Sequence, residues 1–299
     1  MENFALILAA ILIGYIIQKL KIFPEDSPNM LNQFVIYISL PSMVLLEIPK
    51  LSLSFESISP VVIAWIVTTV AIIFVFLVSK FYGFSREVTG SLMLVSVLGN
   101  TTYMGIPLVG AYLGESSLPY VLLYDQLGSF VFLSIYGTFI ASYYSKTTEL
   151  NLQILVKKVL TFPPTISLIL ALFLSGVEYP PFISSVLSSF ASTIIPIALV
   201  AVGLQLRLKL TSDELKPLSV ALTTKLILSP LIAYLVCLIF SWDSIASKTS
   251  ILEAGMSPMI TAAAIASMSG LAPKLSSAIV GYGILLSFLT TAILYKFVI

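Results

Sequence analysis

The sequence predicts an all-α polytopic membrane protein, and three observations carry this prediction. Of the 299 residues, 58% are hydrophobic and only 10% are charged, whereas an ordinary soluble domain carries roughly 25% charged residues. The mean hydropathy is +1.07. Apolar runs of about 20 residues, the length that a helix needs to cross a ~30 Å hydrocarbon layer, recur along the chain.

Composition also excludes several functions. The chain has no His and a single cysteine, Cys237, so it cannot form a Ser-His-Asp triad, a His-ligated metal site or an internal disulfide. An intramembrane aspartyl protease needs paired Asp residues, and only Asp125 lies inside a span. We therefore expect no enzyme activity and no cofactor other than a coupling ion. A formal net charge of +1 gives no basic field for nucleic acid.

Ten spans follow from the apolar runs, five on each side of one longer connection. The first lacks the basic start and the small-residue cleavage site of a signal peptide, so we expect it to stay as a helix. The loops are too short to hold a separate soluble domain. The spans are 3–20, 30–48, 59–79, 88–113, 119–143, 163–177, 182–206, 217–240, 246–269 and 274–296.

The distribution of Lys and Arg predicts the orientation. Alternate loops, beginning with the loop after the first span, hold eleven of these residues, and the opposite side holds three. The positive-inside rule then places both termini outside the cytoplasm, in the cytoplasmic (inner) membrane of the cell. The connection 144–162 mixes apolar residues with Lys157 and Lys158, which is typical of a cytoplasmic interfacial helix.

Because five is an odd number, the second group of spans must enter the membrane from the opposite side to the first. This is the arrangement of inverted-topology transporters. We predict two inverted five-helix repeats, 1–143 and 163–299, joined by the linker 144–162. An offset of 155 residues supports the repeat, because it places Pro41 on Pro196 and Met104 on Met259.

Two spans in equivalent positions, 88–113 and 246–269, are interrupted by Gly, Pro and polar residues. An unpaired backbone group in hydrocarbon costs several kcal/mol, so such a break must be buried in protein or line a wet cavity. Gly and Pro could also make simple kinks, but corresponding breaks in both halves favour a transporter's binding site. The predicted substrate-binding residues are Asn100, Thr101, Thr102, Tyr103, Gly255, Met256, Ser257 and Pro258, together with Pro41.

Each break is expected to present helix ends of both polarities. Ser257 suits an N-cap and Pro258 suits the first helical position, which predicts a half-helix that begins at Pro258. Its free amides favour an anion such as a carboxylate. Carbonyls at the ends of the preceding half-helices, near Gly99 and Ala254, favour a cation. A crossing of the two breaks would hold a small organic anion and a coupling cation together.

Three ionisable residues, Lys225, Asp125 and Glu253, lie inside predicted spans, where each costs roughly 2.5–3.5 kcal/mol on insertion scales. Oxygen ligands suit a hard ion such as Na⁺, and protonation of Glu253 is the proton-coupled alternative. Lys225 is an internal cation that pairs with an acid or attracts the substrate, or else a side chain that snorkels to a headgroup. The predicted cation site consists of Glu253, Ala254, Asp125, Gln126, Ser129 and Gly99.

Gly110 and Gly114 form a G-x-x-x-G motif. Such a motif lets two helix backbones approach closely. We expect a close helix crossing within one subunit, and the alternative is a homodimer face.

The run Asn100-Thr101-Thr102-Tyr103-Met104-Gly105-Ile106-Pro107-Leu108 resembles the "N-T-x-x-M-G-I-P-L" run of the auxin efflux carrier family, which includes plant PIN-type carriers and bacterial malate and malonate permease-like members. The run from Glu253 to Pro258 resembles the "E-A-x-M-P-P" run of its bacterial members, with Ser257 where a Pro is common. Leu40-Pro41 also fits. The resemblance covers essentially the whole chain.

The resemblance implies two inverted five-helix repeats and a sodium/proton antiporter-like, bile-acid-symporter-like fold. It implies a scaffold part of helices 1, 2, 6 and 7 and a transport part of helices 3–5 and 8–10, in which crossed helices 4 and 9 carry the site and move by elevator-type alternating access. Asn100 takes the place of the family's crossover Asn. Glu253 departs from the plant pattern, which has an uncharged residue there, and bile-acid/sodium symporters place a sodium-binding Glu in an analogous spot.

We therefore expect a secondary active transporter of a small organic anion in the lipid bilayer, coupled to Na⁺. The alternatives are a proton-coupled or uncoupled carrier of an auxin-like aromatic weak acid, and a channel or sensor with a transporter fold.

Overall fold

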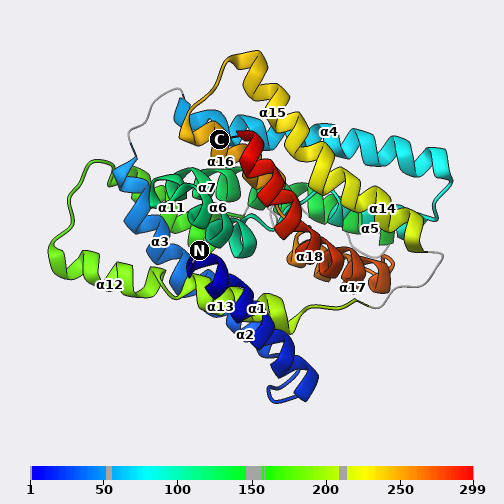
Figure 1. Cartoon of the computed structure of the whole chain (residues 1–299), viewed down its shortest axis with the longest axis horizontal. Helices are drawn as coiled ribbons and strands as arrows, with labels where there is room; N and C mark the ends of the chain where they lie inside the picture. Colours follow the sequence, from blue (N-terminus) through cyan, green and yellow to red (C-terminus); the bar gives the residue numbers. More distant parts are fainter. Residues whose placement is uncertain (1, 52–55, 146–156, 158, 209–213, 299) are drawn as a thin grey trace.

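A computed structural model describes residues 2–51, 56–145, 157, 159–208 and 214–298 (Figure 1). All regular structure in these ranges is helical. The α-helices are α1 (Glu2–Leu20), α2 (Ser27–Phe34), α3 (Leu40–Glu47), α4 (Ser59–Tyr82), α5 (Arg86–Val95), α6 (Ile106–Leu113), α7 (Leu118–Leu123), α8 (Phe130–Phe132), α9 (Thr138–Ser145), α11 (Pro163–Phe173), α12 (Pro181–Ala191), α13 (Ile194–Leu204), α14 (Leu215–Thr223), α15 (Ser229–Phe240), α16 (Ile245–Ala254), α17 (Ile260–Met268) and α18 (Pro273–Val298). Short 3₁₀ turns are η2 (Ile48–Lys50), η3 (Glu56–Ile58) and η5 (Glu115–Ser117), and π-helical turns are η1 (Val35–Ser39), η4 (Thr101–Gly105), η6 (Tyr124–Ser129), η7 (Leu133–Gly137) and η9 (Thr224–Leu228).

The all-helical membrane class is confirmed. Within the described ranges, six continuous stretches are long and apolar enough to cross a membrane, and α1 and α11 supply shorter apolar helices. The ten-span arrangement as two inverted repeats stays a prediction, and the linker 144–162 lies largely outside the described residues. The six stretches are Ser27–Lys50, Ser59–Tyr82, Glu115–Ser145, Pro181–Leu204, Leu215–Phe240 and Pro273–Phe297.

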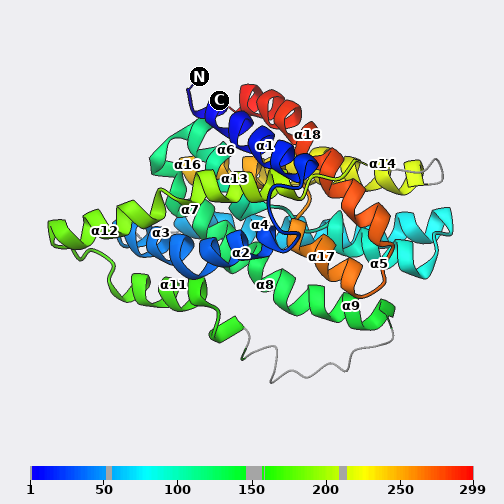
Figure 2. The same cartoon turned by 90° about the horizontal axis from the view of Figure 1, so that it is seen from below.

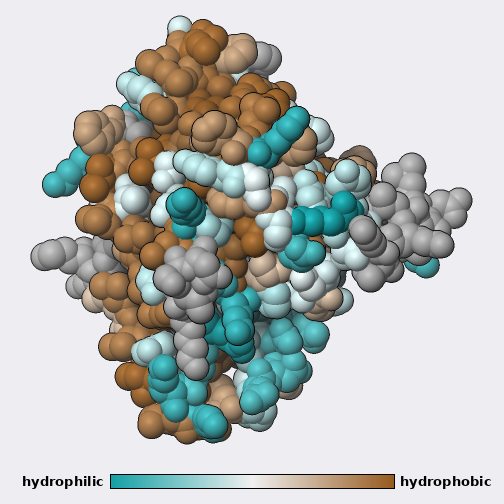
Figure 3. Space-filling model, turned by 90° about the vertical axis from the view of Figure 1, so that its right-hand side faces the viewer, coloured by the Kyte–Doolittle hydropathy of each residue, from teal (hydrophilic) through white to brown (hydrophobic). Residues whose placement is uncertain are grey.

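Long apolar side chains cover much of the outer surface. Leu12 on α1 is 56% exposed, Leu77 on α4 is 58% exposed and Ile239 on α15 is 76% exposed. Figure 3 views one end of the molecule, where hydrophilic residues gather across the middle and lower part and apolar residues line the upper and left margins. This outer surface suits contact with lipid, in which exposed apolar side chains carry no hydration cost.

Three of the π-helical turns have a cause in the sequence. Each ends two residues before a proline: η1 before Pro41, η4 before Pro107 and η9 before Pro230. A proline has no N–H and its ring clashes with the carbonyl four residues earlier, which widens the preceding turn. The prolines therefore place one wide turn directly after Asn100 and another around Lys225.

One layer of the molecule consists of α1, α2, α3, α11, α12 and α13. In this layer α1 packs along α13, and α3 packs against both α11 and α12 (Figure 2). Gly14 and Gly203 bring α1 and α13 together, because a Cβ on Gly203 would lie 2.2 Å from the Ile11 carbonyl oxygen. The other helices include the two interrupted spans, which consist of α5 with α6 and of α16 with α17. Helices α4, α15 and α16 are in mutual contact, and α17 packs on α5 and α18.

The close crossing predicted at Gly110 and Gly114 is wrong. Gly114 ends α6 with φ of 80°, so it does not lie on a helix face. A Cβ on Gly110 would meet only Leu118, at an ordinary 3.4 Å. The close approach of two helices instead occurs at Gly14 and Gly203.

Candidate functional site

The two interrupted spans cross each other at their breaks. Gly99 and Pro258 form an isolated antiparallel bridge. On one side of it the Asn100 amide donates to the Ser257 carbonyl over 2.8 Å, and on the other the Met259 amide donates to the Leu98 carbonyl over 2.9 Å. Each break thus supplies main-chain hydrogen-bond partners to the other, which is how irregular backbone survives inside a membrane protein.

The crossing is locally symmetric. The helices that lead into it, α5 and α16, both have 10 residues. Each has a serine N-cap, Ser85 or Ser244, whose hydroxyl accepts the amide three residues later. From Gly99 to Pro258 the offset is 159 residues, so the two breaks correspond in a register that differs by four residues from the predicted 155.

The second half-helix begins later than the sequence predicts. Helix α17 starts at Ile260, with the extended residue Met259 as its N-cap. Ser257 and Pro258 cannot start it because the Ser257 carbonyl and the Met259 amide are bound to the first break. The first amides of α17 after its cap, those of Ile260 to Ala262, have no acceptor within the helix and form its anion-favouring end.

Asn100 caps the half-helix of the first break. Its Oδ1 accepts the Tyr103 amide over 3.3 Å, and its carbonyl accepts the amides of Met104 and Gly105. Its Nδ2 is buried with no hydrogen-bond partner, and so is the Ser257 hydroxyl on the opposite strand of the crossing. Two buried donors without partners therefore belong to residues whose main chains are bonded to each other, and an unsatisfied buried group costs about 1–3 kcal/mol.

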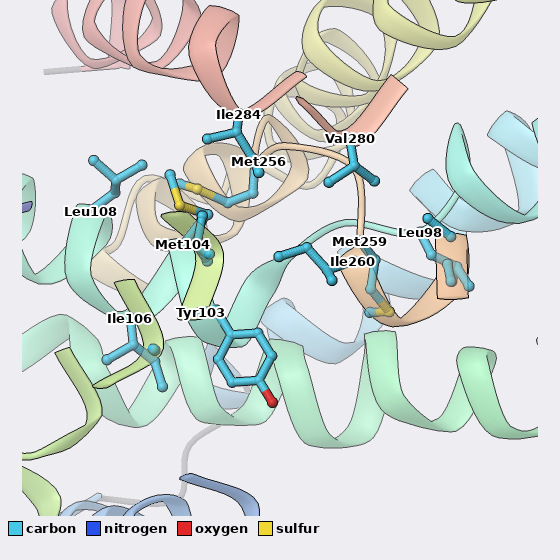
Figure 4. Close-up of a cluster of buried hydrophobic side chains, with 14 of the residues drawn as sticks. Leu98, Tyr103, Met104, Ile106, Leu108, Met256, Met259, Ile260, Val280 and Ile284 are labelled. Carbon is cyan, nitrogen blue, oxygen red and sulfur yellow. The ribbon is translucent and has the colours of Figure 1, made fainter. Parts of the chain in front are cut away.

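Buried apolar side chains pack around the crossing. Met104 and Met256 lie side by side near Ile284 of α18, and the ring of Tyr103 points away from them (Figure 4). Gly283 of α18 allows the close approach, because a Cβ there would lie 2.3 Å from Pro258 Cδ. Met256 is thus a packing residue in this structure.

Asp125 connects the first break to η6. Its Oδ1 accepts the hydroxyls of Thr101 at 2.5 Å and Thr102 at 2.8 Å, and its Oδ2 accepts Gln126 Nε2 at 2.6 Å. The carboxyl is 2% exposed. Thr101, Thr102, Gln126 and Asp125 therefore form one cluster, although the first two were predicted for the substrate and the others for the cation.

Glu253 is fully buried, and neither carboxylate oxygen has a hydrogen-bond partner. The carboxylate lies against the first break, since a Cβ on Gly105 would be 2.3 Å from Oε1 and 2.5 Å from Oε2. Thr249, four residues earlier on α16 and hence on the same face, also has a buried hydroxyl without a partner. The sequence prediction missed both Gly105 and Thr249; the Thr249-x-x-x-Glu253 spacing was the signal for the latter.

Lys225 reaches the crossing from η9. Its Nζ donates to the Ala254 carbonyl over 3.0 Å, and a Cβ on Gly99 would lie 2.8 Å from both Nζ and Cε. Lys225 is 2% exposed, so the snorkelling alternative is wrong. The ammonium lies near Gly99 and Ala254, at the position where the sequence predicted carbonyl groups that favour a cation.

The remaining predicted residues lie nearby or apart. Gly255 follows α16, where a Cβ would meet Leu294 at 3.1 Å and Pro230 at 3.4 Å. Ser129 is buried at the end of η6. Pro41 lies in α3, which packs mainly against α11 and α12, so a role for it in binding stays a prediction.

A family model described as "Membrane transport protein" matches residues 1–295. The chain belongs to this family, that of the auxin efflux carriers. This confirms the resemblance found in the sequence, and it makes the protein a member of a family of multi-pass membrane transporters.

Two archaeal relatives match over most of their length. An uncharacterized transporter of Methanocaldococcus jannaschii is 28% identical over 271 residues, which cover 87% of each chain. An uncharacterized transporter of Methanothermobacter thermautotrophicus is 22% identical over 268 residues, which cover 89% of this chain and 87% of its own. The likeness therefore spans both breaks of the transporter.

Proposed function

We propose that this transporter is a secondary active carrier of a small organic anion, coupled to Na⁺ at Glu253. The observation that carries the proposal is the Glu253 carboxylate, which is buried beside the crossing with both oxygens unpaired. A carboxylate left in this state is costly. A structural role alone would leave that cost without compensation.

The charge balance supports one coupling cation. Asp125, Glu253 and Lys225 are the buried Asp, Glu, Lys and Arg residues of the described ranges, and their formal charges sum to minus one. Asp125 is satisfied by three hydrogen bonds. We therefore assign the cation that would balance this charge to Glu253. The hydroxyl of Thr249 adds a further unpaired oxygen there, and oxygen ligands suit a hard cation.

The anion would bind where the same crossing offers hydrogen-bond donors. The unpaired Asn100 Nδ2 and Ser257 hydroxyl and the first amides of α17 all offer hydrogen to a carboxylate. Hydrogen bonds to a charged group contribute about 1.5–3 kcal/mol each. With the cation at Glu253 the three buried residues and the cation carry no net formal charge, so the anion would meet a neutral crossing instead of a negatively charged one, which is a physical route to coupling.

Contacts between layers suit alternating access by an elevator. The crossing lies against the α1 and α13 layer, since η4 contacts α13 and α6 contacts α1. A cleft of about 350 Å³ lies near the end of α3, which belongs to the same layer. Glu47 and Lys50 line it on one side, and Ser116 and Tyr120 near the start of α7 line it on the other. We propose that the body containing the crossing slides against α1, α3, α11, α12 and α13 during transport.

Flux in proteoliposomes tests this proposal. Radiolabelled malonate, acetate and benzoate serve as probes under separately imposed Na⁺ and proton gradients. An inward Na⁺ gradient should accelerate uptake of at least one probe by the wild type but not by Glu253→Gln, and the exposed Glu25→Gln should behave as wild type. Uptake that no cation gradient changes in any variant would contradict coupling at Glu253. Acceleration by the proton gradient alone would support the proton-coupled alternative, and single-channel currents would support a channel.

A further inference from the structure

Lys225 enters the proposed coupling only through its formal charge, and its position at the crossing has no role there. It lies in the π-helical turn η9, whose widening follows from Pro230. The turn lies in the predicted span 217–240, four spans after the first break, yet the Nζ atom lies against both interrupted spans, at Gly99 and at the Ala254 carbonyl. Such a position requires an explanation, because a buried ammonium is expensive in a membrane protein.

The acceptor of Lys225 is a helix-end carbonyl. Ala254 is the last residue of α16, and the following amides of Gly255 and Met256 donate to Ile251, Leu252 and Glu253 instead. The Ala254 carbonyl is therefore one that the helix end leaves for another donor, at the negative end of the helix dipole. A free metal cation would find this position favourable if the lysine were absent.

No ion pair joins Lys225 to a carboxylate in the described part of the chain. Glu253, the residue next to Ala254, interacts with it through space but keeps both oxygens unpaired. The ammonium thus balances charge in the crossing without occupying Glu253. This arrangement leaves Glu253 open for a free ion.

We propose that the Lys225 ammonium is a built-in cation that fills the carbonyl end of the crossing, so that one free cation binds per transport cycle instead of two. The inference rests on the proposed cation coupling and names its stoichiometry. The lysine supplies a permanent positive charge where a second coupling ion would otherwise bind.

Counting bound ²²Na⁺ at saturation on purified protein, without any organic anion, tests the inference. Lys225→Met keeps the aliphatic chain but is one atom shorter, so it vacates the place of the ammonium. It should bind one more Na⁺ per chain than the wild type. Lys248→Met is the matched control, because Lys248 pairs with the exposed Asp243 at the start of α16, and its count should equal that of the wild type.

The increment separates this inference from the proposed function. If the wild type binds no Na⁺ and Lys225→Met binds one, Na⁺ coupling is wrong but the role of Lys225 stands. If both bind one, the role of Lys225 is overturned and Na⁺ coupling stands.

A second variant covers the case in which Lys225→Met does not fold. Lys225→Ala removes the side-chain atoms that propylammonium can replace, so millimolar propylammonium should raise its melting temperature. Propanol, which lacks the charge, should not raise it, and neither compound should change Lys248→Ala. Equal effects of propylammonium and propanol on Lys225→Ala would show a packing role and overturn the inference.

Discussion

The main-chain amide of Asn100 donates to the main-chain carbonyl of Ser257 over 2.8 Å, and the side chains of the same two residues keep buried polar atoms without partners. The main-chain hydrogen bonds that join the two breaks are therefore made without a ligand, whereas these two side-chain atoms lack partners. The main chain fixes the geometry, and Asn100 Nδ2 and the Ser257 hydroxyl remain the unpaired groups to which we assign the solute in our proposal.

The contact between Gly105 and Glu253 gives the first prediction. Gly105→Ala would place a Cβ 2.3–2.5 Å from both carboxylate oxygens, so the carboxylate must move. Overpacking of this kind costs about 1–3 kcal/mol, and we expect a lower melting temperature together with loss of Na⁺-stimulated uptake. Gly110→Ala on the adjacent helix is the control, because its Cβ would meet only Leu118 at 3.4 Å. Wild-type melting and uptake in Gly105→Ala would contradict the carboxylate's position.

The hydrogen bonds of Asp125 give the second prediction. Asp125→Asn and Thr102→Val should each lower the free energy of unfolding, and the double variant should lose less than the sum, with a coupling of about 0.5–3 kcal/mol. The measurement is a double-mutant cycle on denaturant midpoints in detergent. Asp243→Asn, whose side chain is 88% exposed, should change stability by less than about 1 kcal/mol. Strict additivity of Asp125→Asn and Thr102→Val would show that the threonine hydroxyl does not bind this carboxylate.

The close packing of α1 and α13 gives the third prediction. A Cβ in Gly203→Ala would lie 2.2 Å from the Ile11 carbonyl oxygen, which is backbone and cannot rotate away. We expect a loss of about 1–3 kcal/mol or more, seen as a lower melting temperature. Gly137→Ala has room, with its nearest contact at 3.4 Å from Leu133, and should melt near the wild type. Equal melting of the two variants would refute the close approach.

The sequence predicted the crossing because its signals are local. Polar and helix-breaking residues such as Gly99, Asn100 and Pro258 inside apolar runs require backbone partners, and in a membrane those partners come from the protein itself. The position of Glu253 and Asn100 at the crossing was predictable for the same reason, since an ionisable or amide side chain in a span calls for partners inside the protein, whereas their roles in transport stay predictions.

Tertiary hydrogen bonds explain what the sequence could not predict. The capping signal at Ser257-Pro258 failed because the Ser257 carbonyl is held by Asn100 and the next amide by Leu98, which shifts the start of α17. The bond from Lys225 to Ala254 joins residues 29 apart on different helices, and no local pattern encodes it. Likewise, Gly114 ends a helix, so the G-x-x-x-G spacing carried no packing information.

Exchange of labelled carboxylates across proteoliposome membranes most directly tests the claim that the crossing binds the solute. Counterflow of malonate, acetate and benzoate is measured for wild type, for Asn100→Ser with Ser257→Ala, and for the exposed pair Asn29→Ser with Ser185→Ala. Serine at position 100 retains an oxygen that can cap the half-helix, so the loss is confined to the unpaired donors. We predict that the crossing variant loses at least about tenfold in apparent affinity, which corresponds to one hydrogen bond to a charged group, while the exposed variant exchanges as wild type. A folded crossing variant that exchanges every probe at the wild-type rate and affinity would contradict the account.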